Sequence, residues 1–250
     1  MKKLIAANWK MNKTASEAVS TVKELKALVR ESGNADIVLC PPSTALHAVS
    51  KELTGSNIKL GAQNMHFELS GAYTGEISPI MLKEIGCEFV ILGHSERREF
   101  FHEDDSFINR KVISALKNGL NPLLCIGESL EQRQKQQTED VLEGQLTKCL
   151  EGISDIRNVS IAYEPVWAIS RGDPNKKAAT ASDAEQAHFF IRKVLSGAYG
   201  KPSEGTRILY GGSMKPENAK ELLALPNIDG GLIGNASLNA KSFFDIIKSA

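Results

Sequence analysis

Residues 89–125 read FVILGHSERREFFHEDDSFINRKVISALKNGLNPLLC, and in this stretch two short apolar runs flank a longer amphipathic segment. The runs at 89–92 and 122–125 are continuously apolar, which is typical of strands buried on both faces. The segment 107–117 spaces its apolar residues as a helix does, and Gly119 follows where a C-terminal helix cap is expected. The stretch therefore predicts a strand, a helix and a second strand.

The same strand–helix unit recurs on both sides of this stretch. We expect strands over residues 4–7, 37–40, 58–62, 89–92, 122–125, 159–162, 208–210 and 231–233. We expect helices over residues 19–28, 45–53, 79–85, 107–117, 131–151, 184–198, 216–225 and 243–248. Strict alternation predicts parallel strands that are joined by right-handed crossovers.

Two α/β architectures share this alternation, an open doubly wound sheet and a closed barrel. The count of eight strands and the length of 250 residues favour closure, because a (β/α)8 barrel, also called a TIM barrel, has about 250 residues. No linker, low-complexity segment or sequence repeat divides the chain. We therefore predict a single barrel domain over residues 1–250.

The charge balance argues against broad electrostatic binding. Basic and acidic side chains number 30 each, so we expect neither nucleic acid nor an anionic membrane as a partner. The apolar stretch at the N-terminus is too short for a signal peptide, and no run is long enough to span a membrane. The four cysteines form no C-x-x-C pair, which favours reduced core thiols over a disulfide or metal site. A cytoplasmic protein is the resulting expectation.

Reactive side chains and glycine-rich turns follow the predicted strands. In a (β/α)8 barrel the carboxyl ends of the strands form the functional rim. The candidates are Asn8 and Lys10 after the first strand, His94 after the fourth, Glu164 after the sixth, residues 211–213 after the seventh and 234–237 after the eighth. Glycine-rich turns that lead into helices bind phosphate through free backbone N–H groups. Either turn alone could be an ordinary turn, but the two together match the phosphate position of such barrels.

Three of these side chains suit proton transfer. Glu164 follows an apolar strand, where burial would raise its pKa and make it a stronger base. His94 begins a segment that can form a helical turn, whose N-terminus favours a neutral, donating imidazole, and Lys10 can stabilise negative charge. A surface carboxylate, a core histidine and a solvated lysine are the ordinary alternatives. Taken together with a phosphate site, the three predict proton abstraction beside a carbonyl through an enediolate.

Several motifs resemble those of one enzyme family. NWKMN at 8–12, GHSERR at 93–98, YEPVWAI at 163–169, YGGS at 210–213, GAQN at 61–64 and GAYTGE at 71–76 look like signatures of the triosephosphate isomerases. The resemblance covers the whole chain. It implies an isomerase without metal or organic cofactor that interconverts D-glyceraldehyde 3-phosphate and dihydroxyacetone phosphate in glycolysis and gluconeogenesis.

The resemblance also implies a catalytic role for each reactive side chain. Glu164 would move the proton between the two carbons of the substrate. His94 would polarise the carbonyl and shuttle protons between the oxygens. Lys10 and Asn8 would stabilise the enediolate and help to hold the substrate. Glu96 would contact the catalytic residues without touching the substrate itself.

A phosphate site and a closing lid are further implications of the resemblance. Backbone donors at Ser213, Gly234 and Asn235 would hold the phosphate, joined by Ser170 when the lid closes. The implied supporting residues are Cys125 near the base, Glu128 as a partner of Trp167 during lid movement, and Tyr210 as a latch.

The chain departs from the family pattern in the lid and in the phosphate site. Residues 168–179 read AISRGDPNKKAA, which is about four residues longer than the usual lid and adds a modest closure cost. Residues 172–175 are predicted to form a turn at the lid tip. Ser170 replaces a glycine, which affects the backbone angle of the closed lid. Asn235 also replaces a glycine, but asparagine tolerates left-handed angles and keeps its N–H, so we expect phosphate binding to persist.

The long loop at residues 63–76 resembles the family's protruding loop, which docks into a second subunit. An isologous homodimer is implied, and a plain surface loop is the alternative. The loop residues that we expect at the interface are Gln63, Asn64, Thr74, Gly75 and Glu76.

Two other functions stand beside the isomerase. A sugar-phosphate epimerase or lyase on the same fold normally needs a metal cluster or a Schiff-base lysine at the rim, and the sequence shows no such cluster. A silent barrel kept as a scaffold is disfavoured because Lys10, His94 and Glu164 occur together.

Overall fold

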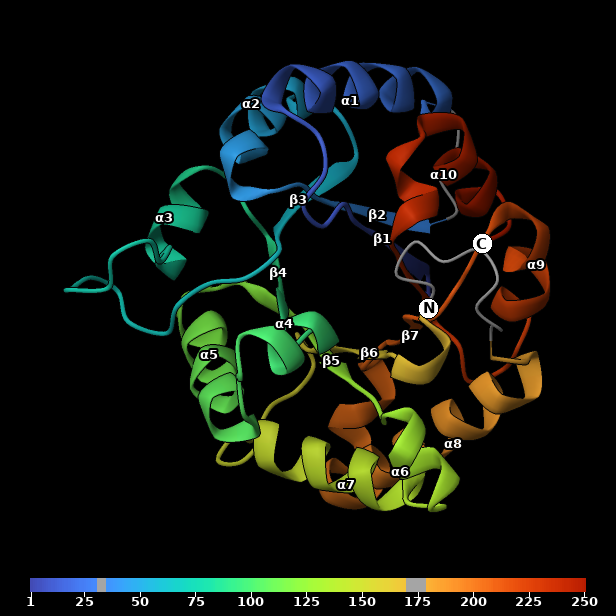
Figure 1. Cartoon of the computed structure of the whole chain (residues 1–250). Helices are drawn as coiled ribbons and strands as arrows, with labels where there is room; N and C mark the ends of the chain where they lie inside the picture. Colours follow the sequence, from blue (N-terminus) through green and yellow to red (C-terminus); the bar gives the residue numbers. More distant parts are fainter. Residues whose placement is uncertain (31–34, 170–178) are drawn as a thin grey trace.

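The strands form a closed parallel barrel in the computed structural model, which describes residues 1–30, 35–169 and 179–250 (Figure 1). Each strand pairs with the next along the chain, and β8 returns to pair with β1. The strands are β1 (Lys3–Asn8), β2 (Ala35–Cys40), β3 (Ile58–Ala62), β4 (Phe89–Leu92), β5 (Asn121–Ile126), β6 (Ser160–Tyr163), β7 (Ile208–Tyr210) and β8 (Gly230–Ile233). The predicted (β/α)8 barrel is therefore confirmed.

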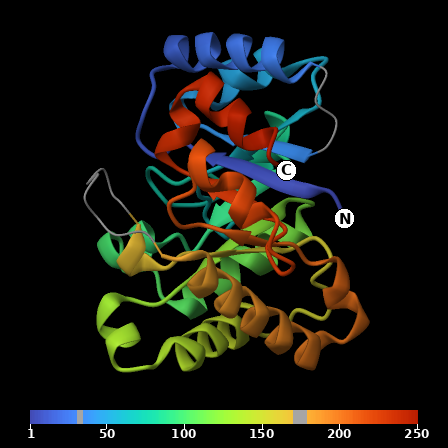
Figure 2. The ribbon, with the colours of Figure 1, turned by 90° about the vertical axis from the view of Figure 1, so that its right-hand side faces the viewer.

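Helices surround the barrel, and Figure 2 shows α1 and α2 on one side of the strands with α7 and α8 on the opposite side. The α-helices are α1 (Ala15–Val29), α2 (Ser43–Leu53), α3 (Pro79–Glu84), α4 (Ser95–Phe100), α5 (Asp105–Lys117), α6 (Leu130–Gln134), α7 (Thr138–Cys149), α8 (Ala181–Tyr199), α9 (Pro216–Leu223) and α10 (Ala240–Ile247). The described residues also form the short 3-10 helices η1 (Val166–Ala168), η2 (Lys201–Gly205) and η3 (Asn235–Leu238). None of the helices in the described part of the chain is long and apolar enough to cross a membrane.

One predicted helix is wrong in its continuity. The segment 131–151 was expected to be a single helix, but it is divided into α6 and α7. The backbone of Gln136 has a φ of 58°, which lies in the left-handed region and ends the first helix. Neither glycine nor proline marks this break, so the sequence pattern alone does not locate it.

Two layers of apolar side chains hold the barrel together. Successive residues of a strand point to opposite faces, so Leu4 and Ala6 fill the barrel interior while Ile5 and Ala7 face the helices. The interior cluster consists of Leu4, Ala6, Val38, Cys40, Phe89, Ile91, Leu123, Cys125, Ala162, Leu209 and Leu232. The interior of the barrel is thus a packed core and not a pore.

The seam between β8 and β1 depends on a glycine. Gly230 has a φ of 153°, and a Cβ built on it would lie 1.9 Å from the carbonyl oxygen of Leu4. Because that distance is far below any non-bonded contact, the last strand can approach the first only with glycine at this position.

Candidate active site

A cavity of about 1070 Å³ lies at the carboxyl ends of the strands. It brings together side chains and turns from β1, β4, β6, β7 and β8, as the strand-end argument predicted. Among its lining residues are Asn8, Lys10, His94, Glu96, Glu164, Gly211, Gly212, Ser213, Gly234 and Asn235.

Glu164 follows β6 and is buried at the base of this cavity. Its Oε1 lies 3.0 Å from Nε2 of His94, and its Oε2 accepts a hydrogen bond of 2.9 Å from the backbone N–H of Ser95. Both carboxylate oxygens are therefore engaged by the segment that follows β4. The turn after β7 also lies close to Glu164, because a Cβ on Gly211 would lie 2.8 Å from Cγ of Glu164.

These contacts overturn the expected direction of the Glu164 pKa. Burial alone raises the pKa of this carboxyl, and it is the largest single effect. The hydrogen bond from His94, the N–H of Ser95 and the charge of Lys10 act against burial and hold the pKa below its ordinary value. Burial of Glu164 can be expected from the sequence, but the donors that offset its effect on the pKa reach the carboxylate only through tertiary folding.

His94 is the N-terminal cap of α4, and its ring forms two defined contacts. Nδ1 accepts a hydrogen bond of 3.2 Å from the backbone N–H of Glu96. A ring nitrogen that accepts carries no proton, so we assign the neutral tautomer with its proton on Nε2. That proton points at Glu164, 3.0 Å away. The arrangement supports the neutral, donating imidazole expected from the sequence.

Lys10 is held at the rim in a strained backbone conformation. Its φ is 52°, which is rare for a residue with a side chain. The Asn8 side chain accepts a hydrogen bond of 3.0 Å from the Lys10 N–H, and the Gln63 side chain donates one of 2.9 Å to the Lys10 carbonyl. The ammonium lies 2.6 Å from Oε1 of Glu96. Gln63, which was expected at a subunit interface, thus holds the backbone of the loop that carries Lys10.

The turns after β7 and β8 also line the cavity. Asn235 begins η3 directly after Gly234, and Ser213 precedes α9. Asn235 does not adopt a positive φ, so the left-handed tolerance of asparagine is not used here. The replacement of glycine at this position therefore introduces no backbone strain of that kind.

A buried carboxylate lies beside the start of the predicted lid. Glu128 is fully buried and accepts hydrogen bonds of 2.8 Å from Nε1 of Trp167 and 3.1 Å from the hydroxyl of Tyr163. The guanidinium of Arg133 lies 4.2 Å from the centre of the Trp167 ring and 3.5 Å from Glu128. The sequence pointed to Glu128 and Trp167 but missed Tyr163 and Arg133, which no motif marked as partners.

The other supporting residues occupy the barrel and its edge. Cys125 points into the packed interior, where burial raises the pKa of its thiol well above the ordinary range. Tyr210 is buried, and its hydroxyl lies so close to Gly212 that a Cβ there would be 2.3 Å from it. The predicted lid contact of Ser170 and the predicted turn at 172–175 lie outside the described residues.

Comparisons with known proteins agree with this geometry. The sequence model of triosephosphate isomerase matches residues 3–250. A triosephosphate isomerase of Clostridium novyi is 52% identical over 249 residues, which cover 98% of this chain and 98% of that protein. The chain belongs to the triosephosphate isomerase family. The isomerase of Carboxydothermus hydrogenoformans is 50% identical and covers 100% of this chain and 99% of its own.

A solved structure is similar over the full length. The crystal structure of triosephosphate isomerase from Bartonella henselae has a TM-score of 0.91 and 40% sequence identity. It covers 100% of this chain and 99% of its own. The triosephosphate isomerase fold is therefore shared from end to end.

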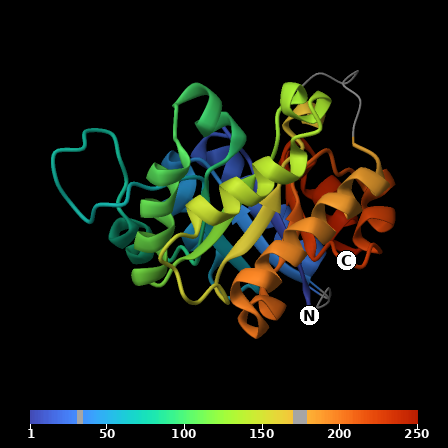
Figure 3. The same cartoon turned by 90° about the horizontal axis from the view of Figure 1, so that it is seen from below.

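The loop that resembles the family's docking loop projects from the barrel between β3 and α3 (Figure 3). Thr74, Gly75 and Glu76 are exposed at its far end. Asn64 lies at its base, where its side chain accepts a hydrogen bond of 2.8 Å from the buried Lys111 ammonium. The base of the loop is thus held to α5 by this hydrogen bond, while the residues at its tip are exposed on the surface.

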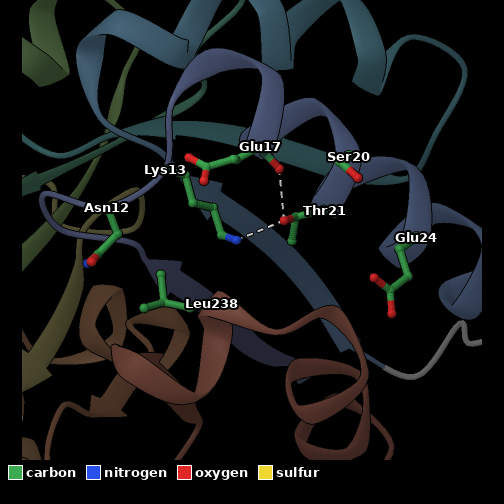
Figure 4. A pocket seen from close by; sticks show the side chains of 7 residues that line it. All are labelled: Asn12, Lys13, Glu17, Ser20, Thr21, Glu24 and Leu238. Carbon is green, nitrogen blue, oxygen red and sulfur yellow. Dashed lines mark hydrogen bonds between the residues drawn. The ribbon is translucent and has the colours of Figure 1, made fainter.

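A smaller cavity of about 440 Å³ lies beside α1 (Figure 4). Its cation, Lys13, donates a hydrogen bond of 2.8 Å to the hydroxyl of Thr21. Asn12 and Leu238 line this cavity and the larger one. The two cavities therefore share lining residues from the loop after β1 and from η3.

Proposed function

We propose that this protein interconverts D-glyceraldehyde 3-phosphate and dihydroxyacetone phosphate. The observation that carries the proposal is the contact of 3.0 Å between Glu164 and His94, with Lys10 on the same cavity and family membership over the whole chain. A base, a neutral donor and a cation are the groups that proton transfer beside a carbonyl requires.

In the proposed reaction, the Glu164 carboxylate removes a proton from one carbon of the triose and returns it to the neighbouring carbon. The Nε2–H of His94 donates to the carbonyl oxygen, and protons pass between the two oxygens through the ring. Lys10 and Asn8 stabilise the negative charge of the enediolate. These groups supply the base, the acid and the charge, so we expect no cofactor and no metal ion.

Substrate must separate the base from its donor. The Nε2–H of His94 points at Glu164, and the second carboxylate oxygen accepts a hydrogen bond from the backbone N–H of Ser95. One N–H cannot fully serve a carboxylate and a substrate carbonyl together. Binding of the triose therefore replaces the His94–Glu164 contact and frees the carboxylate to reach carbon.

The phosphate of the substrate is proposed to bind the glycine turns. Ser213, Gly234 and Asn235 line the cavity, which supports binding of phosphate by their backbone N–H groups, and Ser170 is proposed to join them. This placement anchors the anionic end of the triose and leaves its carbonyl end facing His94 and Glu164.

We also propose that the protein is a homodimer built on the loop 63–76. The exposed apolar residues on and near this loop support the proposal, because a monomer gains nothing from exposing them. They are Leu69, Tyr73, Ile80 and Met81. The pairing of β8 with β1 supports a single domain over residues 1–250. The four free, buried thiols support a reducing compartment such as the cytoplasm.

A coupled isomerase assay with D-glyceraldehyde 3-phosphate tests the function. Glu164→Asp withdraws the carboxylate by one carbon and should lower kcat by about 10²-fold or more. Glu131→Asp, an exposed residue on α6, is the matched control and should retain wild-type turnover. Wild-type protein without turnover would support the scaffold alternative. Turnover of another sugar phosphate alone would support an epimerase or lyase.

A further inference from the structure

Trp9 is a buried residue that connects the first strand to the phosphate-binding turn. It follows β1 directly, precedes Lys10, and is 1% exposed. Its backbone N–H donates to the Cys40 carbonyl at 3.2 Å, and its indole Nε1–H donates to the Ser237 carbonyl at 3.1 Å. The side chain thus spans from the β1–β2 edge of the rim to η3.

The acceptor lies on the turn that offers phosphate its backbone N–H groups. Ser237 is buried, and its hydroxyl lies 2.7 Å from the Gly234 carbonyl and 3.0 Å from the Ile233 carbonyl. Residues 234–238 are therefore a closed unit that folds back on the end of β8. The Trp9 indole provides a hydrogen bond to this unit from a different strand.

Lys10 lies near the other end of the same unit. Its Cε lies 3.6 Å from the position that a Cβ on Gly234 would occupy. Consecutive residues of one loop thus lie beside both ends of the turn, Lys10 near its start and Trp9 near its end, where the indole hydrogen bond reaches it. The Trp9 ring is backed by Lys13, whose ammonium lies 5.5 Å from the ring centre and bonds to Thr21.

We propose that Trp9 is a positioning residue whose indole N–H holds the turn 234–238 at a fixed distance from Lys10. The inference rests on the proposed function, because it assigns the turn to the substrate phosphate. A triose phosphate is short and must meet its phosphate donors and the ammonium at once. A turn that is free to shift would offer these two contacts at varying separations, which weakens binding of the intact substrate.

The indole could instead serve only to fill space in the core. Trp9→Phe separates the two roles, since it keeps an aromatic ring in the core but removes the N–H. The Ser237 carbonyl is then left buried without its donor, and the turn is freed from the loop after β1. Tyr199→Phe is the matched control, because it removes a donor to the Leu150 carbonyl at the far end of α8, away from both cavities.

The test measures the dissociation constant of inorganic phosphate by calorimetry, together with kcat/KM for D-glyceraldehyde 3-phosphate and for D-glyceraldehyde, which lacks the phosphate. We expect Trp9→Phe to weaken phosphate binding by roughly three- to tenfold. The kcat/KM for the phosphorylated substrate should fall by a similar factor, while that for glyceraldehyde and both values for Tyr199→Phe stay at wild type. Unchanged phosphate affinity, or an equal loss on both aldehydes, would overturn the proposal.

A second variant covers the case in which Trp9→Phe does not fold. Site-specific incorporation of 3-benzothienylalanine at position 9 keeps the bicyclic shape and replaces the N–H with sulfur. The same three measurements apply to it. Failure of the proposed function is distinguishable, because wild-type protein without isomerase activity would still show whether phosphate affinity depends on the Trp9 N–H.

Discussion

Nε2 of His94 lies 3.0 Å from Oε1 of Glu164, so the candidate acid and the candidate base are in direct contact. The Glu96 N–H donates a hydrogen bond to Nδ1 of the His94 ring, and the Ser95 N–H donates one to the Glu164 carboxylate. Since α4 supplies all of these donors, the start of this short helix orients both reactive groups before substrate arrives.

Glu164 should remain ionised below its ordinary pKa of 4.5. Its stabilising contribution is then complete above pH 4.5 and is lost as the pH falls through the lowered value of the folded state. Carbon-13 NMR of the glutamate carboxyls, assigned with Glu164→Gln, measures the titration. His94→Ala should raise the pKa, because the carboxylate then loses the hydrogen bond from His94. Titration of wild-type Glu164 above pH 4.5 would contradict the contacts described.

His188 should make the protein less stable in mild acid. It is fully buried between α8 and the barrel, with Nδ1 2.7 Å from the Ala184 carbonyl and aromatic neighbours Tyr163 and Tyr210. Burial lowers the pKa of His188 to about 4. Between pH 6.5 and 4 the unfolded state therefore binds a proton that the folded state does not bind. Over this pH range the free energy of unfolding falls by about 3 kcal/mol.

Urea unfolding at several pH values measures this effect. His188→Gln should flatten the fall in unfolding free energy between pH 6.5 and 4, whereas His47→Gln, at an exposed position, should leave the slope of the wild type. Equal slopes in wild type and His188→Gln would refute the assignment.

Gly230→Ala should open the barrel seam. The added Cβ meets the Leu4 carbonyl oxygen at 1.9 Å, so β8 must move away from β1 and lose its ladder. We expect a loss of about 4 kcal/mol or more, or a failure to fold. Gly144→Ala is the control, because Gly144 lies within α7 and a Cβ there has open space. That change should stabilise by about 0.5–1 kcal/mol. Thermal unfolding of both variants decides whether the seam is the cause.

Gln63→Met should lower activity through the backbone of Lys10. The Gln63 amide donates to the carbonyls of Lys10 and Cys40, both at 2.9 Å, and Lys10 is held at a φ of 52°. Methionine preserves the volume but removes both hydrogen bonds, so the ammonium loses its fixed position. We expect kcat to fall by roughly tenfold, with a loss of about 1–3 kcal/mol in stability.

Sedimentation of the same variant at several concentrations separates this role from the proposed interface. A change in subunit association with unchanged activity of the dimer would show that Gln63 acts at the interface alone.

The order and number of strands could be predicted because each strand is buried on both faces. Such strands are short apolar runs that stand out from the amphipathic helices between them, as at 89–92 and 122–125. The strand-end rule then placed Lys10, His94 and Glu164 on one rim without reference to coordinates. Local polarity and chain connectivity carry this information, so a single sequence was sufficient for it.

Other features depended on contacts between residues far apart in the chain. The lowered pKa of Glu164 arises from donors about 70 positions away. The Gln63 amide reaches the carbonyl of Lys10 after β1 and that of Cys40 on β2, and the Trp9 indole meets Ser237 at the opposite end of the sequence. The division of α6 from α7 at Gln136 likewise has no local signal. Hydrophobic periodicity determined which segments would pair and which end of the barrel would react. Only the tertiary structure decided which hydrogen bonds those segments exchange, because the strength and direction of a hydrogen bond depend on atomic separations that periodicity does not encode.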